Sequence, residues 1–170
     1  RLGRSDEYDF HLGRSFNYRN LFNRQTGFFH PKDTAGEFIE PFDYIFSGGL
    51  GARDYYDENN AWTYIWDVHH NIADLIALFG GEKPFADKLD RLFAEGLHTS
   101  KWQYYSKLPD SSGNVGQYVM GNEPSFHIPW VYNWLGRPDK TSKVINRILN
   151  EQYTSAPDGL PGNDDLGTMG

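Results

Sequence analysis

Residues 60–93 read NAWTYIWDVHHNIADLIALFGGEKPFADKLDRLF, and apolar side chains recur through this stretch at helical spacing. Before the Gly80-Gly81 pair they stand at positions 68, 72, 75, 76 and 79, which lie on one face of a helix. The two glycines are typical of a helix end, and Pro84 is a favoured first helical residue. The short link predicts an antiparallel helical hairpin, with helices over residues 60–79 and 84–96.

The same periodicity predicts three further helices on either side of this hairpin. The first covers residues 5–23, the fourth runs from Pro124 to Gly136, and the fifth begins at Pro138. Long segments at 27–59, 97–123 and 153–170 are rich in glycine, aromatic and polar residues, and loops of this length are usually functional or disordered. We therefore expect an all-α fold, part of a toroid built of helical hairpins, with a site formed by long functional loops at one mouth.

The composition suits one domain and argues against several classes of protein. The 170 residues carry 16 Lys and Arg against 23 Asp and Glu, and this net charge of −7 argues against binding nucleic acid through its phosphates. No apolar run approaches the ~20 residues that a membrane-spanning helix needs. Cysteine is absent, which excludes a disulfide framework and a cysteine nucleophile. Aromatic residues reach 16%, which favours either an aromatic core or surfaces that stack on sugars.

The two ends of the sequence indicate a segment of a longer polypeptide. It begins at Arg1 without an initiator methionine or a signal peptide, and it stops at Gly170 within a stretch rich in Gly and Asp. We expect residues 1–170 to be one part of a single catalytic or binding domain whose remainder lies elsewhere in the parent protein.

Glu123 is the leading candidate for a catalytic residue. It stands in the run Gly121-Asn122-Glu123-Pro124-Ser125, at the predicted start of the fourth helix. Proline pushes the residue before it into an extended conformation, so the sequence predicts a carboxylate held extended at the mouth of a helix. The alternative is a carboxylate that only complements the helix dipole.

Two other segments could bind a sugar or a cation. Trp62 and Trp66 stand four residues apart and would share a helix face, either as a stacking platform or as core. Residues 158–167 read DGLPGNDDLG, whose oxygen atoms could hold sugar hydroxyls or a hard cation, or form a solvated turn. His69 and His70 lack the spacing of a zinc protease, so we expect no histidine-based zinc site.

Five segments together resemble glycoside hydrolase family 92, the calcium-dependent, exo-acting α-mannosidases. In chain order they are NAWTYIW at 60–66, LFGG at 78–81, GNEPS at 121–125, GRPDKT at 136–141 and DGLPGNDDLGTM at 158–169. The resemblance extends over essentially all 170 residues. It implies a catalytic domain that is an (α/α)6 toroid, preceded in the parent protein by a β-sandwich domain.

The resemblance also implies an activity and places residues in it. The family removes terminal α-linked mannose from glycans with inversion, and Ca²⁺ holds the 2- and 3-hydroxyls of the sugar. Glu123 falls on the general acid, with Asn122 beside it as a substrate contact. Asn163 and Asp164 fall on positions that line the leaving-group subsite, where α-1,2-specific members carry His-Glu, so this departure puts an α-1,2 preference in doubt. A second departure is Phe126, where many members have His.

Several parts of the machinery are expected outside this chain. The resemblance places the catalytic base beyond Gly170 and most of the calcium ligands outside this segment, so we expect the segment alone to be inactive. The parent protein is expected to be secreted, periplasmic or attached to the cell surface. Two other hypotheses remain open: a glycan-binding protein without catalysis on the same fold, and another toroidal glycosidase or polysaccharide lyase. Only the mannosidase hypothesis requires both α-mannose and calcium.

Overall fold

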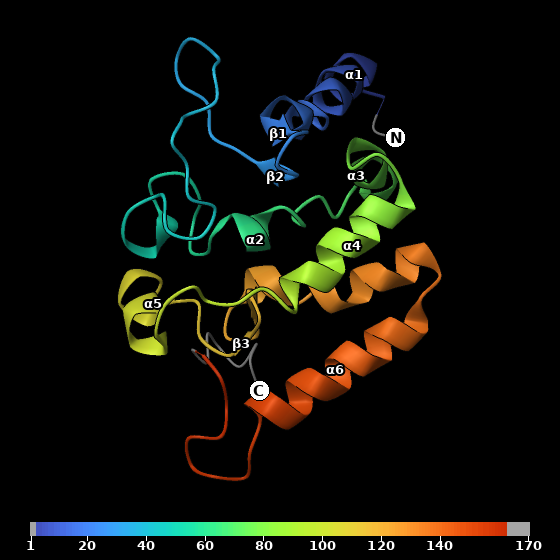
Figure 1. Cartoon of the computed structure of the whole chain (residues 1–170). Coiled ribbons are helices and arrows are strands. Elements are labelled where there is room, and N and C mark those ends of the chain that lie inside the picture. Colours follow the sequence, from blue (N-terminus) through green and yellow to red (C-terminus); the bar gives the residue numbers. More distant parts are fainter. Residues whose placement is uncertain (1–2, 163–170) are drawn as a thin grey trace.

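The computed structural model describes residues 3–162, which form helices, long loops and short β-hairpins (Figure 1). The α-helices of this part are α1 (Ser5–Arg14), α2 (Ala61–Tyr64), α3 (Ile72–Leu78), α4 (Glu82–Leu92), α5 (Lys101–Lys107) and α6 (Pro138–Gln152). Its 3-10 helices are η1 (Asn17–Leu21), η2 (Leu50–Ala52), η3 (Glu123–Ser125) and η4 (Ile128–Leu135). β1 (Phe22–Asn23) pairs antiparallel with β2 (Phe28–Phe29), and β3 (Asn114–Val115) pairs likewise with β4 (Tyr118–Val119). The helix-rich class is confirmed, while the closed toroid stays a prediction.

The helix predicted over residues 60–79 is two helices in the structure. Asn60 caps α2 by accepting a hydrogen bond from the backbone N–H of Trp62 at 3.0 Å. Asn71 then caps α3 by accepting one from the N–H of Asp74 at 3.2 Å. Asparagine is a preferred N-cap, so the second cap starts a new helix where the apolar periodicity alone suggests continuity.

The helix predicted over residues 5–23 is also too long. α1 ends at Arg14 and buries no side chain, and the chain continues through η1 into β1. Asn23 accepts a hydrogen bond from the backbone N–H of Gln25 at 3.0 Å, and Gly27 adopts a positive φ of 66°. This turn draws residues 22–29 into the β1–β2 hairpin instead of a helical end.

The predicted fourth helix is divided into η3 and η4, both of the 3-10 type. Pro124 lies in η3 and Pro129 is the second residue of η4. A proline has no backbone N–H and cannot close an α-helical hydrogen bond four residues back. Two prolines five positions apart therefore favour short 3-10 turns over a continuous α-helix.

The third and fifth helices and both short helical links are confirmed. α4 begins two residues before Pro84, and α6 begins at Pro138. α6 packs against η4 after Gly136, which ends η4 with a left-handed conformation. Thr141 of α6 donates a hydrogen bond to the carbonyl oxygen of Pro129 at 3.1 Å, which fixes this pair side by side. α5 lies within a segment expected to be loop, and Ser100 caps it.

The core surrounds α2, which Figure 1 shows at the centre of the described chain, with α4 beside it. Its fully buried large side chains come from residues far apart in the sequence and include Ile65, Trp66, Leu75, Phe85, Leu89, Leu92, Tyr104, Tyr118, Ile128 and Tyr132. Aromatic residues are thus a large part of the core, one of the two uses expected from the composition. Over residues 3–162, no helix is long and apolar enough to span a membrane.

Candidate active site around Glu123

Glu123 is the first residue of η3 and is half-buried. Asn122 precedes it as the extended cap residue (φ −146°, ψ 138°), so the extended conformation expected for Glu123 belongs to its neighbour. The N–H groups of Ser125 and Phe126 donate to the carbonyl oxygens of Asn122 and Glu123 at 3.2 and 3.0 Å, which closes η3 one residue earlier than predicted. Glu123 therefore lies at the start of a helix, as expected, but as its first residue and not as its N-cap.

Close packing at Gly121 fixes the turn that leads to Glu123. A Cβ atom on Gly121 would lie 2.4 Å from Ser112 Oγ and 2.7 Å from the Ser112 carbonyl oxygen. Only glycine allows the two segments to approach this closely. The glycine of the Gly-Asn-Glu-Pro run thus has a steric role that its place in the sequence alone does not reveal.

Glu58 connects this turn to the residues before α2. Asn122, whose side chain is buried, donates a hydrogen bond from Nδ2 to Glu58 Oε2 at 2.9 Å. The backbone N–H of Glu58 donates to the hydroxyl of Tyr64 at 3.2 Å. Glu58 and Asn122 are 64 positions apart in the sequence, and this hydrogen bond brings their segments together. Glu58 was not expected as a site residue, although it directly precedes the Asn59-Asn60 pair.

A buried polar network holds the start of α2 behind this contact. Asn60 Nδ2 and the Tyr104 hydroxyl both donate to Gln117 Oε1 at 3.1 Å, and Gln117 Nε2 donates to the carbonyl oxygen of Gly96 at 2.7 Å. Ser111 donates to Asn59 Oδ1 at 2.6 Å. Buried hydrogen bonds of this kind favour one arrangement of the segments that they join.

The two predicted tryptophans lie in different surroundings and form no common platform. Trp66 is fully buried, stacks on Phe79 with ring centroids 6.0 Å apart, and meets Phe85 edge-on. Trp62 is 3% exposed and lines a cavity beside α4, where Lys88 lies over its ring. The shared-face interpretation fails because the helix ends at Tyr64, and Trp66 is a core residue.

His127, four residues after Glu123 in the sequence, contacts His69. The rings of His69 and His127 are 3.9 Å apart between centroids, and His127 Nε2 is 3.0 Å from the carbonyl oxygen of Trp66. Burial lowers the pKa of His127, which favours the neutral ring. His69 Nε2 is 2.6 Å from Asp67 Oδ1. No sequence spacing indicates this contact, because the two histidines stand 58 positions apart.

The predicted residues Asn163 and Asp164 lie outside the described residues. Gly162, which precedes them, packs directly on the turn before Glu123: a Cβ atom there would lie 2.2 Å from the carbonyl oxygen of Gly121. Gly162 has a positive φ of 75°, which glycine adopts without strain. Within the predicted segment 158–167, Gly162 thus lies against the turn that carries the predicted acid.

The described residues do not fit a complete calcium site. Among residues 3–162, no group of three or more His, Asp and Glu side chains could hold a metal ion. The buried polar atom without a partner beside Glu58 is Asn59 Nδ2, a donor that cannot ligate a cation.

Comparisons with known proteins identify the family. The profile of the glycosyl hydrolase family 92 catalytic domain matches residues 1–170, and the chain belongs to this family. A protein of Arthroderma benhamiae named as an uncharacterized secreted glycosidase is 31% identical over 186 aligned residues, covering 99% of this chain and 22% of that protein. Resemblance and profile thus agree on the family.

Solved structures of this family share the fold. A family GH92 α-mannosidase from Bacteroides thetaiotaomicron, in complex with mannoimidazole, matches with a TM-score of 0.81 and 30% identity over 99% of this chain and 22% of that one. An inverting family GH92 mannosidase of Bacteroides thetaiotaomicron VPI-5482 matches with a TM-score of 0.72 and 29% identity over 93% of this chain and 21% of that one. The chain thus spans about a fifth of the length of these relatives.

Proposed function

We propose that this chain is the part of an exo-acting, inverting α-mannosidase that supplies the general acid, Glu123. The observation that carries the proposal is the placement of Glu123 at the start of η3, in a turn fixed by the Asn122–Glu58 contact and by the close packing of Gly121. Family membership and the mannosidase names of the similar structures support the choice of substrate.

In this mechanism Glu123, in its protonated form, donates its proton to the glycosidic oxygen as the bond to the mannose carbon breaks. A second carboxylate activates a water molecule on the opposite face of the sugar, typically ~6.5–9.5 Å from the acid. We place this base beyond Gly170, so the chain supplies only one of the two groups. Asn163 and Asp164 would line the leaving-group subsite, and Asn122, whose buried side chain is bonded to Glu58, would hold the turn beside the acid.

The parent protein is proposed to complete the site. It would close the (α/α)6 toroid, carry the β-sandwich domain and hold the calcium ion that binds two mannose hydroxyls. Secretion is proposed as well, supported by the printed name of the Arthroderma benhamiae relative. Trp66 is left out of the proposed sugar contacts because its ring is fully buried in the core.

Mannose release by the full-length protein tests this function. A panel of α-linked mannobioses would be incubated with calcium and, separately, with a chelator, and free mannose would be measured. We expect release in calcium and its loss with the chelator, restored by added calcium. Binding without any release would favour a glycan-binding protein, and release of another sugar from a wider panel would favour a different glycosidase.

A further inference from the structure

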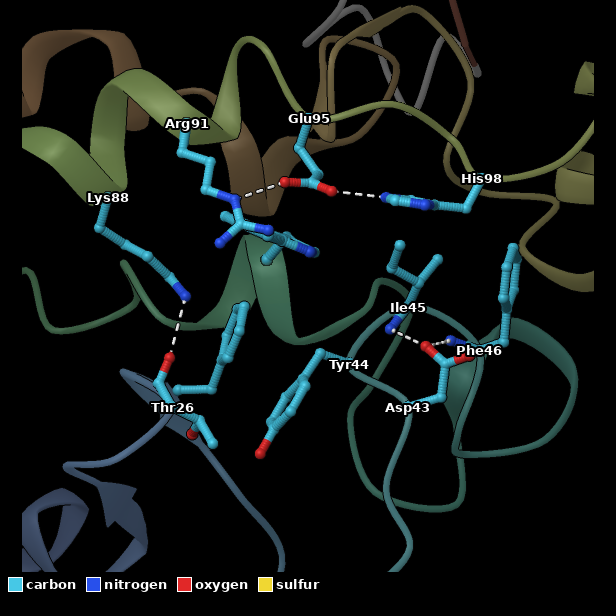
Figure 2. A pocket seen from close by; sticks show the side chains of 11 residues that line it. Thr26, Asp43, Tyr44, Ile45, Phe46, Lys88, Arg91, Glu95 and His98 are labelled. Atoms are coloured by element: carbon cyan, nitrogen blue, oxygen red, sulfur yellow. Dashed lines mark hydrogen bonds and ion pairs between the residues drawn. The ribbon is translucent and has the colours of Figure 1, made fainter.

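Two hollows on the described chain differ in the chemistry of their walls. The cavity beside α4 contains several charged groups, and Figure 2 shows Glu95 between Arg91 and His98, both of which contact it. A groove of about 250 Å³ between η4 and α6 is lined, among residues 3–162, by apolar and aromatic side chains. We call it the η4–α6 groove. Its wall favours an apolar occupant over a charged ligand.

α6 carries a wider apolar stripe than the described chain covers. Ile148 is buried, and the helix packs against η4. Ile145 and Leu149 stand four residues apart, so they share one side of α6, and both line the groove. Leu149 is nevertheless 51% exposed, and Trp130, which lines the groove from η4, is 56% exposed. Contiguous exposed apolar surface of this kind marks an interaction site.

The groove borders the segment that carries the predicted acid. Met120 stands three positions before Glu123 and Phe126 three positions after it, and both side chains line the groove. A segment that covers the groove would therefore pack against this segment on both sides of Glu123.

The described chain reaches residue 162 at the edge of the groove. A Cβ atom on Gly121 would lie 3.0 Å from the Cα atom of Gly162. One on Gly113 would lie 2.8 Å from Pro161 Cβ and 3.4 Å from Met120 Cβ. Because Met120 lines the groove, residues 161–162 run close beside it.

The size of the groove favours an occupant from the same polypeptide. Within residues 3–162 it has nine lining residues, whereas each partner in a stable complex of separate proteins contributes ~20–30 residues. A segment of the same chain needs no such area, because covalent linkage keeps it at a high effective concentration. The parent protein can supply such a segment, since this chain spans about a fifth of the length of its relatives.

We propose that the η4–α6 groove is the docking site for the apolar face of a helix from the part of the parent protein beyond Gly170. The inference rests on the proposed function, which already places the catalytic base in that part. A helix fits because an apolar stripe is stabilised by burial against another element, and the fold is helix-rich. Its side chains would remove Trp130 and Leu149 from water and hold Met120 and Phe126, which flank the predicted acid.

Photo-crosslinking in the intact full-length protein tests the identity of the occupant. Leu149 would be replaced by p-benzoylphenylalanine, the protein irradiated, and the crosslinked peptides identified by mass spectrometry. Asn150 is the matched control position, because it is exposed and its amide bonds to the carbonyl oxygen of Asn146 on the polar side of α6. We expect position 149, but not position 150, to crosslink within one chain to an apolar peptide beyond residue 170, with a yield unchanged by tenfold dilution.

Three outcomes would overturn the proposal: crosslinked dimers that disappear on dilution, a crosslink confined to residues before 171, or no crosslink at 149 above that at 150. The first would identify a second copy as the occupant. The crosslink is read without any activity assay. A crosslink beyond residue 170 in a protein that releases no mannose would therefore support the docking site and contradict only the proposed function.

Thermal unfolding of the full-length protein gives a second test that needs no bulky probe. A leucine in an open groove contributes little to stability, whereas one buried under a docked helix contributes as a core residue does. We expect Leu149→Ala to lower the midpoint by about 4 °C or more and Asn150→Ala to change it by less than about 1 °C. Equal, small shifts in the two variants would show that the groove is open and would contradict the proposal.

Discussion

Contacts of the neighbouring side chains, and not only its own short helix, hold the predicted acid in position. Glu123 lies at the start of a three-residue helix, which has little rigidity of its own. Asn122 links that helix to Glu58 at 2.9 Å, and Glu58 in turn is tied through its backbone to Tyr64 of α2. We therefore regard Glu58 as a positioning residue that acts on Glu123 through Asn122.

Substitution of Glu58 tests this role. Glu58→Ala removes the acceptor of the Asn122 amide, while Glu58→Gln keeps an oxygen that can accept it. A hydrogen bond to a charged group contributes about 1.5–3 kcal/mol, so we expect kcat/KM for mannobiose to fall by about tenfold or more in the alanine variant. The glutamine variant should retain most of the activity. Thermal unfolding curves would verify that both proteins are folded. Equal activity of the alanine variant and the unmodified protein would contradict the role.

Sequence patterns identify residues whose type and neighbours are distinctive, but not their distant partners. The Gly-Asn-Glu-Pro run is sufficient to single out Glu123 and to place it near a helix start. The contacts of Glu58 and His127 cannot be seen in the sequence, because each joins residues more than 55 positions apart. Trp66 is ambiguous in the sequence, since a stacking platform and a core require the same spacing, and only its burial separates them.

Helix boundaries depend on local signals that apolar periodicity does not contain. The hairpin around Gly80-Gly81 and the helix from Pro138 follow from glycine and proline chemistry and are confirmed. The helix expected over residues 5–23 ends at Arg14, before the turn at Asn23, and the one expected over residues 60–79 ends at Tyr64 and restarts after the Asn71 cap. These asparagines were visible in the sequence, but apolar spacing on both sides suggested continuity.

Hydrogen bonds between side chains of η1 and α3 allow a test of how these two helices stabilise each other. Asp74 of α3 accepts a hydrogen bond from Arg19 Nε at 2.8 Å and another from the Tyr18 hydroxyl. We expect Asp74→Asn to lower the free energy of unfolding by about 1–2 kcal/mol, since a charge-assisted pair is lost. Asp87→Asn, which breaks an exposed pair with Lys83 on α4, should cost less than about 0.5 kcal/mol. Urea unfolding of both variants would measure the difference.

The same link predicts the direction of a pH effect. Hydrogen bonding by Arg19 holds the pKa of Asp74 below its usual value in the folded chain. The stabilisation is therefore complete above the ordinary carboxyl pKa near about 4 and is lost as the pH falls through the lower folded value. The gap in stability between Asp74→Asn and the unmodified protein should shrink in that acid range. A gap that is constant down to the folded pKa and below would exclude the ion pair as its source.

For the whole molecule, our proposal is that this chain supplies one side of a site that the parent protein completes. It covers about a fifth of its relatives, and within residues 3–162 no cluster of ligands for a metal ion is present. Gly162, the last described residue, packs on Gly121 in the turn before Glu123. The helix-rich class and the family could be predicted from sequence, whereas the closed toroid and the catalytic base stay predictions because the chain spans only about a fifth of its relatives.

The most direct test of the central claim compares two leaving groups in the full-length protein. Glu123→Gln would be assayed on an α-mannobiose, whose departing hydroxyl needs a proton, and on 2,4-dinitrophenyl α-mannoside, whose departing phenolate does not. Glu151→Gln, on the exposed end of α6, is the control. We expect Glu123→Gln to lose about 10²–10⁴-fold in kcat/KM on mannobiose but less than about tenfold on the activated substrate. Equal losses on both substrates, or no loss on mannobiose, would contradict the assignment of Glu123 as the general acid.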